Sequence, residues 1–164
     1  MNFNLSLTAR GFSMVELLVV MSVVAVLALM AVPNLQEQTI RNQIAEAVPL
    51  ADLAKSPILA TWANLHVLLP DNPSAGLPAA DKIVNNFISA LAVENGAIHI
   101  TFGNRANRHI KGKILTLRPA IVEDAKIVPI TWICGYAKAP DKMTIKGDNK
   151  TNVPTAYLPL SCRA

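Results

Sequence analysis

The chain has 164 residues, of which 52% are hydrophobic, and a formal net charge of +4. This length suits one domain, alone or with an appendage, and so small a net charge does not by itself single out an anionic partner. The mean hydropathy of +0.35 is high for a soluble domain, and the apolar excess is concentrated near the N-terminus.

Residues 12–32 form a long apolar segment. As a helix it would be about 32 Å long at 1.5 Å per residue, which matches a hydrocarbon core of about 30 Å. We therefore expect a transmembrane helix, with Arg10 keeping the N-terminus in the cytoplasm and the rest of the chain outside it. A secretory signal peptide is the alternative, but no A-x-A cleavage pattern precedes Pro33.

One residue in this segment does not suit a plain anchor. Glu16 lies four residues after Phe12, and an ionised carboxylate facing lipid costs about 2.5–3.5 kcal/mol even on lenient scales. The structural alternative is a glutamate whose carboxylate reaches the membrane edge.

Residues 33–65 predict an amphipathic helix that continues the apolar segment. Its apolar residues recur mostly every three to four positions, at Leu35, Ile40, Ile44, Val48, Ala51, Ile58, Trp62 and Leu65. A proline costs about 3 kcal/mol in a regular helix interior. We therefore expect bends at Pro33 and Pro49, or an end near Pro57, and then a proline-rich loop over residues 66–86.

A four-stranded antiparallel sheet is expected over residues 87–134. Asn95-Gly96 is a strong hairpin signal between residues 89–94 and 97–102. Across this turn Val93 should face Ile98 and Leu91 should face Ile100, all on one side of the sheet. Further strands fit residues 113–119 and 128–134. The amphipathic helix is the natural cover for the apolar face, so the fold class is α+β.

The two cysteines, Cys134 and Cys162, allow one intramolecular pairing. The predicted orientation places them in an oxidising compartment, where a disulfide would stabilise the loop over residues 134–162 by about 3–4 kcal/mol. Two free thiols or a metal pair are the alternatives. A metal would need further ligands, and the three histidines are scattered along the chain.

The stretch RGFSMVELLVV, residues 10–20, together with Pro33 at the end of the apolar run, resembles the type IV prepilin signature. The resemblance extends over nearly the whole chain, to short-leader pilins of Gram-negative bacteria whose mature form starts with phenylalanine. It implies a long helical spine packed on a four-stranded sheet, with a C-terminal loop closed by a disulfide.

By this resemblance, residues 1–11 are a leader that a prepilin peptidase cuts off between Gly11 and Phe12 before it methylates the new amine of Phe12. Residues 12–32 would then be the transmembrane and filament-core half of the helix, and residues 33–164 the periplasmic globular domain. In the filament, Glu16 would meet the amine of Phe12 in a neighbouring subunit, and the helix around Pro33 would loosen.

The function implied is structural: a subunit that polymerises through its apolar helix into a surface fibre for adhesion, twitching motility or DNA uptake. Its partners would be other copies of the chain, the inner membrane before assembly, the prepilin peptidase, the pilus assembly machinery and minor pilins. The alternatives are a minor pilin, a type II secretion pseudopilin or a membrane-anchored periplasmic binding domain.

The residues contain no catalytic motif of the HExxH, GxSxG or P-loop kind and indicate no enzyme, cofactor or metal site. Residues 104–113 carry four lysines and arginines, a weak footprint for nucleic acid. No aromatic residue is interleaved for base stacking, so a solvated loop is the preferred interpretation.

Overall fold

The computed structural model describes residues 11–125 and 127–164. The chain divides into two compact units, Met1–Gln36 and Glu37–Ala164. The described part of the first unit is three irregular residues followed by the start of helix α1, which spans Met14–Ala47 and continues into the second unit. No helix in the described ranges has the length and apolar character needed to cross a membrane. The transmembrane prediction for residues 12–32 is therefore not confirmed.

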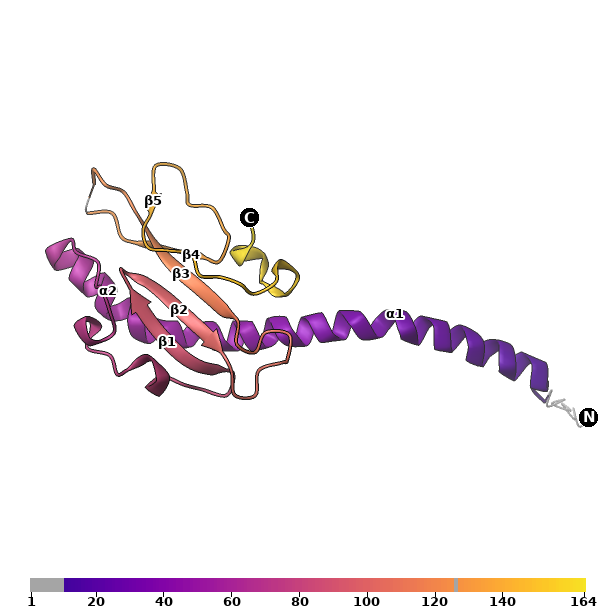
Figure 1. Cartoon of the computed structure of the whole chain (residues 1–164). Coiled ribbons are helices and arrows are strands. Elements are labelled where there is room, and N and C mark those ends of the chain that lie inside the picture. Colours follow the sequence, from indigo (N-terminus) through magenta and orange to yellow (C-terminus); the bar gives the residue numbers. More distant parts are fainter. Residues whose placement is uncertain (1–10, 126) are drawn as a thin grey trace, which may run out of the picture. The chain divides into compact units, whose positions relative to one another are not determined.

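Three helical segments follow one another without a gap over residues 14–65 (Figure 1). After α1 comes a 3-10 turn, η1, Val48–Ala51, and then α2, Asp52–Leu65. Pro49 lies in η1, as expected for a break in the α-helix, whereas α1 is assigned without a break across Pro33. The predicted end near Pro57 is wrong, because α2 continues to Leu65.

Packing explains why α2 tolerates an interior proline. Ile58 immediately follows Pro57 and is fully buried, and Trp62 one turn later is also buried. Burying two large side chains offsets the cost of the missing backbone donor. The helix ends where His66 adopts a left-handed conformation, φ 56°, and donates its N–H to the Trp62 carbonyl.

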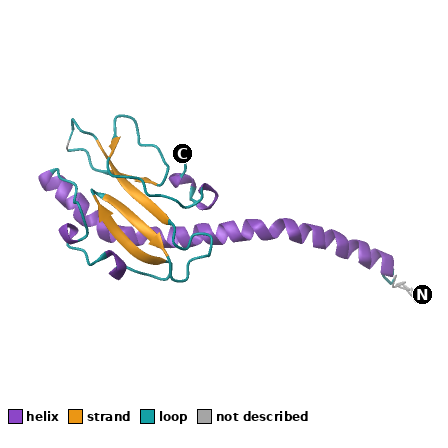
Figure 2. Ribbon diagram, in the orientation of Figure 1, coloured by secondary structure: helices purple, strands orange, loops and turns teal. Residues whose placement is uncertain are grey.

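The sheet has strand order β1-β2-β3-β4 and is antiparallel throughout (Figure 2). Its strands are β1 Ile88–Glu94, β2 Ala97–Phe102, β3 Ile114–Ile121 and β4 Thr131–Cys134. The hairpin register is confirmed, since Leu91 pairs with Ile100 and Val93 with Ile98. A fifth strand that the sequence did not predict, β5 Thr144–Ile145, pairs with the end of β3.

The core of the second unit lies between the helices and one face of the sheet. Helical residues Ile40, Ile44 and Ile58 belong to the same buried cluster as the inward residues Ile98 and Ile100 of β2. The opposite face is covered as well, because His99 and Thr116, whose side chains alternate with those core residues, are buried too. The C-terminal segment, residues 135–164, provides this second cover.

The strand prediction for residues 128–134 was too long. β4 begins only at Thr131, because the residues before it turn: the Val128 N–H bonds to the Ala125 carbonyl at 3.0 Å. Pro129, which has no backbone donor, lies between that turn and the strand.

Candidate functional site

The start of helix α1 is capped by a residue whose role the sequence analysis missed. The Ser13 hydroxyl accepts a hydrogen bond from the Glu16 N–H at 3.2 Å, and the Ser13 carbonyl accepts the first helical bond from Leu17. This is the Ser-x-x-Glu pattern of a capping box, with Ser13 as the N-cap. The signal was present in the sequence and could have placed the helix start.

Glu16 occupies the first turn of α1, where the helix dipole favours a negative charge. Its carboxylate forms no ion pair within the described part of the chain. Phe12, four residues before it, is 75% exposed and lies outside the helix. The structure thus places an unpaired carboxylate one turn from the position that the sequence predicts as a new N-terminus.

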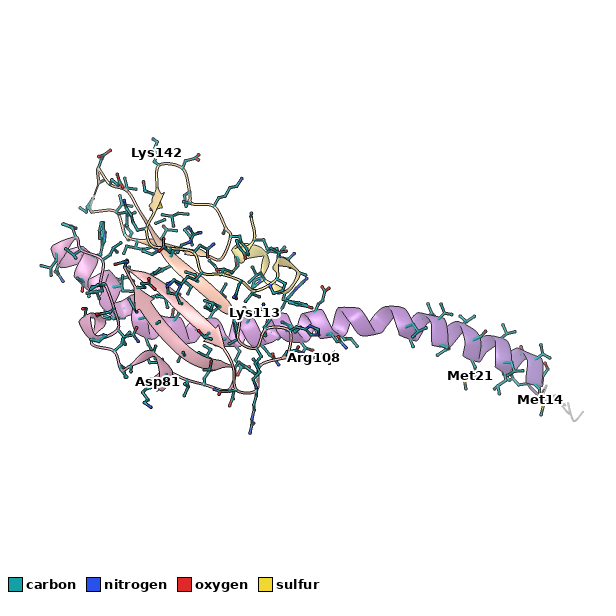
Figure 3. All side chains as sticks on the ribbon, in the orientation of Figure 1. Met14, Met21, Asp81, Arg108, Lys113 and Lys142 are labelled. Carbon is teal, nitrogen blue, oxygen red and sulfur yellow. A yellow bond between two sulfur atoms is a disulfide. The ribbon has the colours of Figure 1, made fainter. Side chains whose placement is uncertain are left out.

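The first half of α1 presents a nearly continuous apolar surface. Over residues 12–29, which include Phe12 just before the helix, the large apolar side chains are all at least half exposed: Phe12, Met14, Val15, Leu17, Leu18, Val19, Val20, Met21, Val23, Val24, Val26, Leu27 and Leu29. Figure 3 shows this for the labelled Met14 and Met21. The polar Ser22 is satisfied within the helix, since its hydroxyl donates to the Val19 carbonyl at 2.7 Å. A surface of this kind is typical of an interaction site.

Two other predicted residues are less fully described. Gly11 lies just before the helix, and the space that a side chain would occupy at this position is open within the described chain. The rest of the predicted leader lies outside the described residues. For Pro33 the structure gives the helical backbone only.

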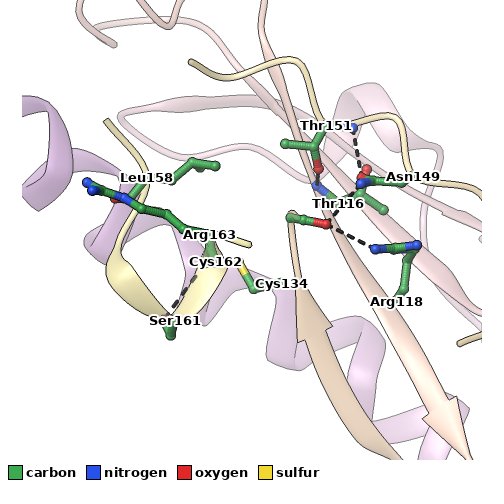
Figure 4. Close-up of a disulfide and its surroundings, with 10 residues drawn as sticks. Thr116, Arg118, Cys134, Asn149, Thr151, Leu158, Ser161, Cys162 and Arg163 are labelled. Carbon is green, nitrogen blue, oxygen red and sulfur yellow. Dashed lines mark hydrogen bonds between the residues drawn. A yellow bond between two sulfur atoms is a disulfide. The ribbon is translucent and has the colours of Figure 1, made fainter. Parts of the chain in front are cut away.

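The predicted disulfide between Cys134 and Cys162 is confirmed (Figure 4). It joins the end of β4 to the short helix η5, Leu160–Cys162. Gly135 makes the close approach feasible: its φ is +57°, and an added Cβ would lie 2.8 Å from the Cys162 carbonyl oxygen. The Tyr136 N–H donates to that same oxygen at 3.0 Å. The C-terminal segment is therefore fastened to the edge of the sheet.

Side-chain hydrogen bonds hold the middle of the C-terminal segment against β3. The Thr116 hydroxyl accepts from the Lys150 N–H at 3.1 Å, and the Thr116 N–H donates to the Thr151 hydroxyl at 3.0 Å. Asn149 donates to the Gly135 carbonyl, and Asn152 accepts from the Ile114 N–H. These short polar side chains replace a regular strand ladder (Figure 4).

A buried histidine lies beneath this segment. His99 is 5% exposed, and its Nδ1 is 3.0 Å from the Thr116 hydroxyl. Its Nε2 is 3.7 Å from the Glu94 carboxylate, which also pairs with Lys150. Burial, followed by the positive charge of Lys150, lowers the pKa of His99 below its usual 6.5. Folding thus favours the neutral form of His99 relative to its charged form.

Two exposed surfaces stand out in the part of the chain that the structure describes. Within the described ranges, no three His, Cys, Asp or Glu side chains come close enough together to hold a metal ion. Cys134 and Cys162 are consumed by the disulfide. The first of the two surfaces is the exposed apolar helix surface with Glu16, and the second is the positively charged loop between β2 and β3; neither has a partner of matching polarity or charge within the described chain.

Comparison with known proteins gives two family matches. Residues 41–163 match the pilin family of bacterial filament proteins, and residues 7–32 match the prokaryotic N-terminal methylation motif.

Three curated relatives are similar along almost their entire length. The type IV major pilin protein PilE of Neisseria gonorrhoeae is 33% identical over 161 residues, which cover 94% of this chain and 93% of the relative. A fimbrial protein of Neisseria meningitidis serogroup A is 32% identical over 163 residues, with 94% of each chain covered. The fimbrial protein EcpC of Eikenella corrodens is 28% identical over 157 residues, with 94% and 90% covered.

Proposed function

Because the chain belongs to the type IV pilin family of bacterial filament subunits, we propose that it is processed between Gly11 and Phe12 before it joins the fibre. Its role in the pilus is structural, as a repeating unit that polymerises into the filament.

Processing would expose the groups that assembly needs. Removal of 11 residues leaves 153 and lowers the formal charge from +4 to +3, because Arg10 is lost with the leader. A prepilin peptidase would cut before Phe12 and methylate its new amine. The match of residues 7–32 to the methylation motif supports this step. In addition, residues 11–13 are not helical, which leaves the scissile bond accessible to a protease.

The unpaired Glu16 carboxylate is the observation that carries the assembly proposal. It belongs to an exposed apolar helix surface and has no ion pair within the described chain. When such helices bundle, the carboxylate of one subunit can meet the Phe12 amine of the next. Removing one member of a buried ion pair costs about 3–5 kcal/mol, because the other member is left uncompensated. Glu16 would therefore fix the axial offset between neighbouring helices, while the apolar surface supplies the attraction that holds the helices together.

Before assembly, the inner membrane would hold the chain through residues 12–32, with residues 33–164 in the periplasm. The composition of this run supports the proposal, since Ser22 is the single polar side chain between residues 17 and 32. Pilus assembly machinery and minor pilins would then extract and add subunits. Pro33, whose ring cannot donate a backbone hydrogen bond, would let the helix loosen in the packed fibre.

The proposal is tested by the mass and the abundance of the protein in sheared surface filaments. We expect the mass of residues 12–164 plus one methyl group and minus two hydrogens, in the most abundant species of the fraction. A full-length mass found only in the membrane would refute processing. Scarcity in the filament fraction would make the chain a minor pilin.

A pair of variants tests the assembly role of Glu16. Glu16→Ala should leave membrane association intact but strongly reduce the filament fraction. Glu46→Ala is the matched control, because Glu46 is an exposed acid on the same helix. Normal, abundant filaments from the Glu16 variant would contradict a role of Glu16 in fixing the axial offset between neighbouring helices.

A further inference from the structure

The loop that joins β2 to β3, residues 103–113, carries a concentrated and unpaired positive charge. We call it the basic loop. Within the described chain, none of its cations, Arg105, Arg108, Lys111 and Lys113, forms an ion pair. Elsewhere in the described chain, Lys55, Lys82, Lys146 and Lys150 pair with nearby carboxylates, while Lys138 and Lys142 do not. The loop itself contains no acidic residue. Its charge is therefore available to an anionic partner.

The basic loop is held in one conformation although its cations reach solvent. Ile110 in its middle is fully buried in the core. Asn104 at its start donates to the Asn85 and Ile88 carbonyls, both at 2.7 Å. Turn bonds from Ile110 and Lys111 to the Asn107 carbonyl, each 2.9 Å, close its centre. A fixed scaffold lowers the entropic cost of binding for the side chains that it presents.

A hydrogen bond attaches the basic loop to helix α1. The Asn107 N–H donates to the Gln43 side-chain oxygen at 2.9 Å. Gln43 follows Val32, the last residue of the apolar run, by eleven residues in the sequence. Arg41, two residues before Gln43, adds a further cation, although Glu37 pairs with it at 3.2 Å. The basic loop is therefore bonded to a residue of α1 that is eleven positions past the end of the apolar run.

From these observations we propose that the basic loop binds the anionic phospholipid headgroups of the membrane that holds the chain before assembly. The inference rests on the membrane stage proposed above. If residues 12–32 are inserted, the basic loop is bonded to a residue only eleven positions beyond the inserted segment, which keeps its cations tethered close to the membrane. Each lysine or arginine within about one Debye length of an anionic membrane surface strengthens binding to that surface roughly fivefold.

The loop suits headgroups better than bases. Recognition of single-stranded nucleic acid relies on aromatic stacking as well as charge, and the loop contains no aromatic residue other than His109. The nearest tyrosine ring, Tyr157, lies 5.9 Å from the His109 ring and is half-buried against it. Headgroup binding needs only exposed cations at a surface, which is what Arg105, Arg108 and Lys111 supply.

The test uses the full-length chain in lipid nanodiscs, with amine acetylation read residue by residue by mass spectrometry. One set of discs contains phosphatidylcholine only, and the other contains about one-third phosphatidylglycerol. We expect Lys111 and Lys113 to be labelled at least about fivefold more slowly in the anionic discs, with the protection lost in high salt. Lys138 and Lys142 are internal controls whose labelling should not change. Figure 3 places Lys142 on a different side of the globular unit from Lys113 and Arg108.

A double variant tests whether the charge itself matters. Arg105→Gln with Arg108→Gln should weaken the protection of Lys111, because two of the four loop cations are gone. The matched control replaces the exposed Lys138 and Lys142 by Gln and should leave that protection unchanged.

Three outcomes would overturn the inference, and they differ from one another. Failure of the chain to co-elute with either kind of disc would refute the membrane stage and the inference with it. Insertion with equal labelling of Lys111 in both lipids would refute the headgroup site alone. Stronger protection by duplex DNA in micelles, at equal phosphate concentration, would assign the basic loop to nucleic acid.

Discussion

Replacing Asn72 should destabilise the globular unit more than any other single change in the loop that follows α2. Asn72 is 6% exposed, and its amide serves three backbone groups. The amide oxygen accepts from the Val93 N–H at 2.6 Å, while the nitrogen donates to the Leu91 carbonyl at 3.0 Å and the Pro78 carbonyl at 2.9 Å. Two of these groups belong to the outer edge of β1, which has no neighbouring strand on that side within the described sheet.

The magnitude follows from counting the groups that lose a partner. Asn72→Ala leaves the buried Val93 N–H and the buried Leu91 carbonyl without a partner, whereas the carbonyl of the exposed Pro78 can bond to water instead. Each of the two buried groups costs about 1–3 kcal/mol, with carbonyls at the lower end. We expect a loss of about 2–4 kcal/mol in the free energy of unfolding, a large share of the roughly 5–15 kcal/mol that holds a typical domain together.

Asn72→Asp gives the sharper test because its effect depends on pH. At neutral pH the carboxylate still accepts from Val93, but its second oxygen faces the Leu91 and Pro78 carbonyls, so this variant should be less stable than Asn72→Ala. Protonation restores one donor, which raises the pKa of the new carboxyl in the folded state. Its stability deficit should therefore shrink as the pH falls below neutral.

The assay is urea unfolding of the full-length chain in detergent, with circular dichroism as the signal that reports unfolding. Asn64→Ala is the control, because Asn64 is exposed and bonds only within its own helix to the Ala60 carbonyl. It should change stability by less than about 0.5 kcal/mol. A loss below about 1 kcal/mol for Asn72→Ala would refute the reasoning, since the edge of β1 would then find other partners.

Three further predictions concern the helix start and the C-terminal segment. Because the pKa of His99 is lowered on folding, the unfolded chain takes up a proton first, and stability should fall as the pH drops below about 6.5. His99→Gln should remove this pH dependence, and an unchanged slope in urea unfolding would contradict it. Gly135→Ala should cost at least about 2 kcal/mol in the same assay, through positive φ and the contact with the Cys162 carbonyl. Gly112→Ala, where φ is +76° but space is open, should cost clearly less, and equal losses would contradict the contact. Ser13→Ala should speed amide hydrogen exchange at the start of α1 by about fivefold, because a lost N-cap costs about 1 kcal/mol. Unchanged protection of these amides in exchange spectra would argue against the cap.

The parts of the fold that the sequence predicted are those governed by strong local rules. Asn95-Gly96 determined the hairpin, and alternation around it determined which side of β2 faces the core, because a one-residue slip would move every apolar side chain to the wrong face. The disulfide was predictable because two cysteines allow one pairing.

The parts that were missed depend on contacts between distant residues. β5 is two residues long, too short to show any periodicity. Pro57 was expected to end the helix, but burial of Ile58 and Trp62 overrides that local preference. The outer face of the sheet was not expected to be covered, because its cover is attached by single side chains such as Asn149 that follow no period.

At the candidate site, Glu16 was singled out as a charge in an apolar run, and Phe12 followed from the resemblance of residues 10–20 to the prepilin signature; both roles stay predictions. The sequence analysis missed Ser13, although the Ser-x-x-Glu pattern is present in the sequence. Neither the buried His99 nor the anchoring of the basic loop could be inferred, since the first requires knowing what covers β2 and the second requires the contact between Asn107 and Gln43.

The disulfide between Cys134 and Cys162 also limits how far a pulled subunit can extend. The two cysteines are 28 positions apart in sequence, but their α-carbons are 4.5 Å apart. A fully extended chain of that length would span about 95 Å. Under tension sufficient to unfold the globular unit, the covalent link keeps nearly all of that contour length out of reach. A fibre built from this chain therefore lengthens less for each subunit that unfolds, and it shortens again sooner when the tension is released.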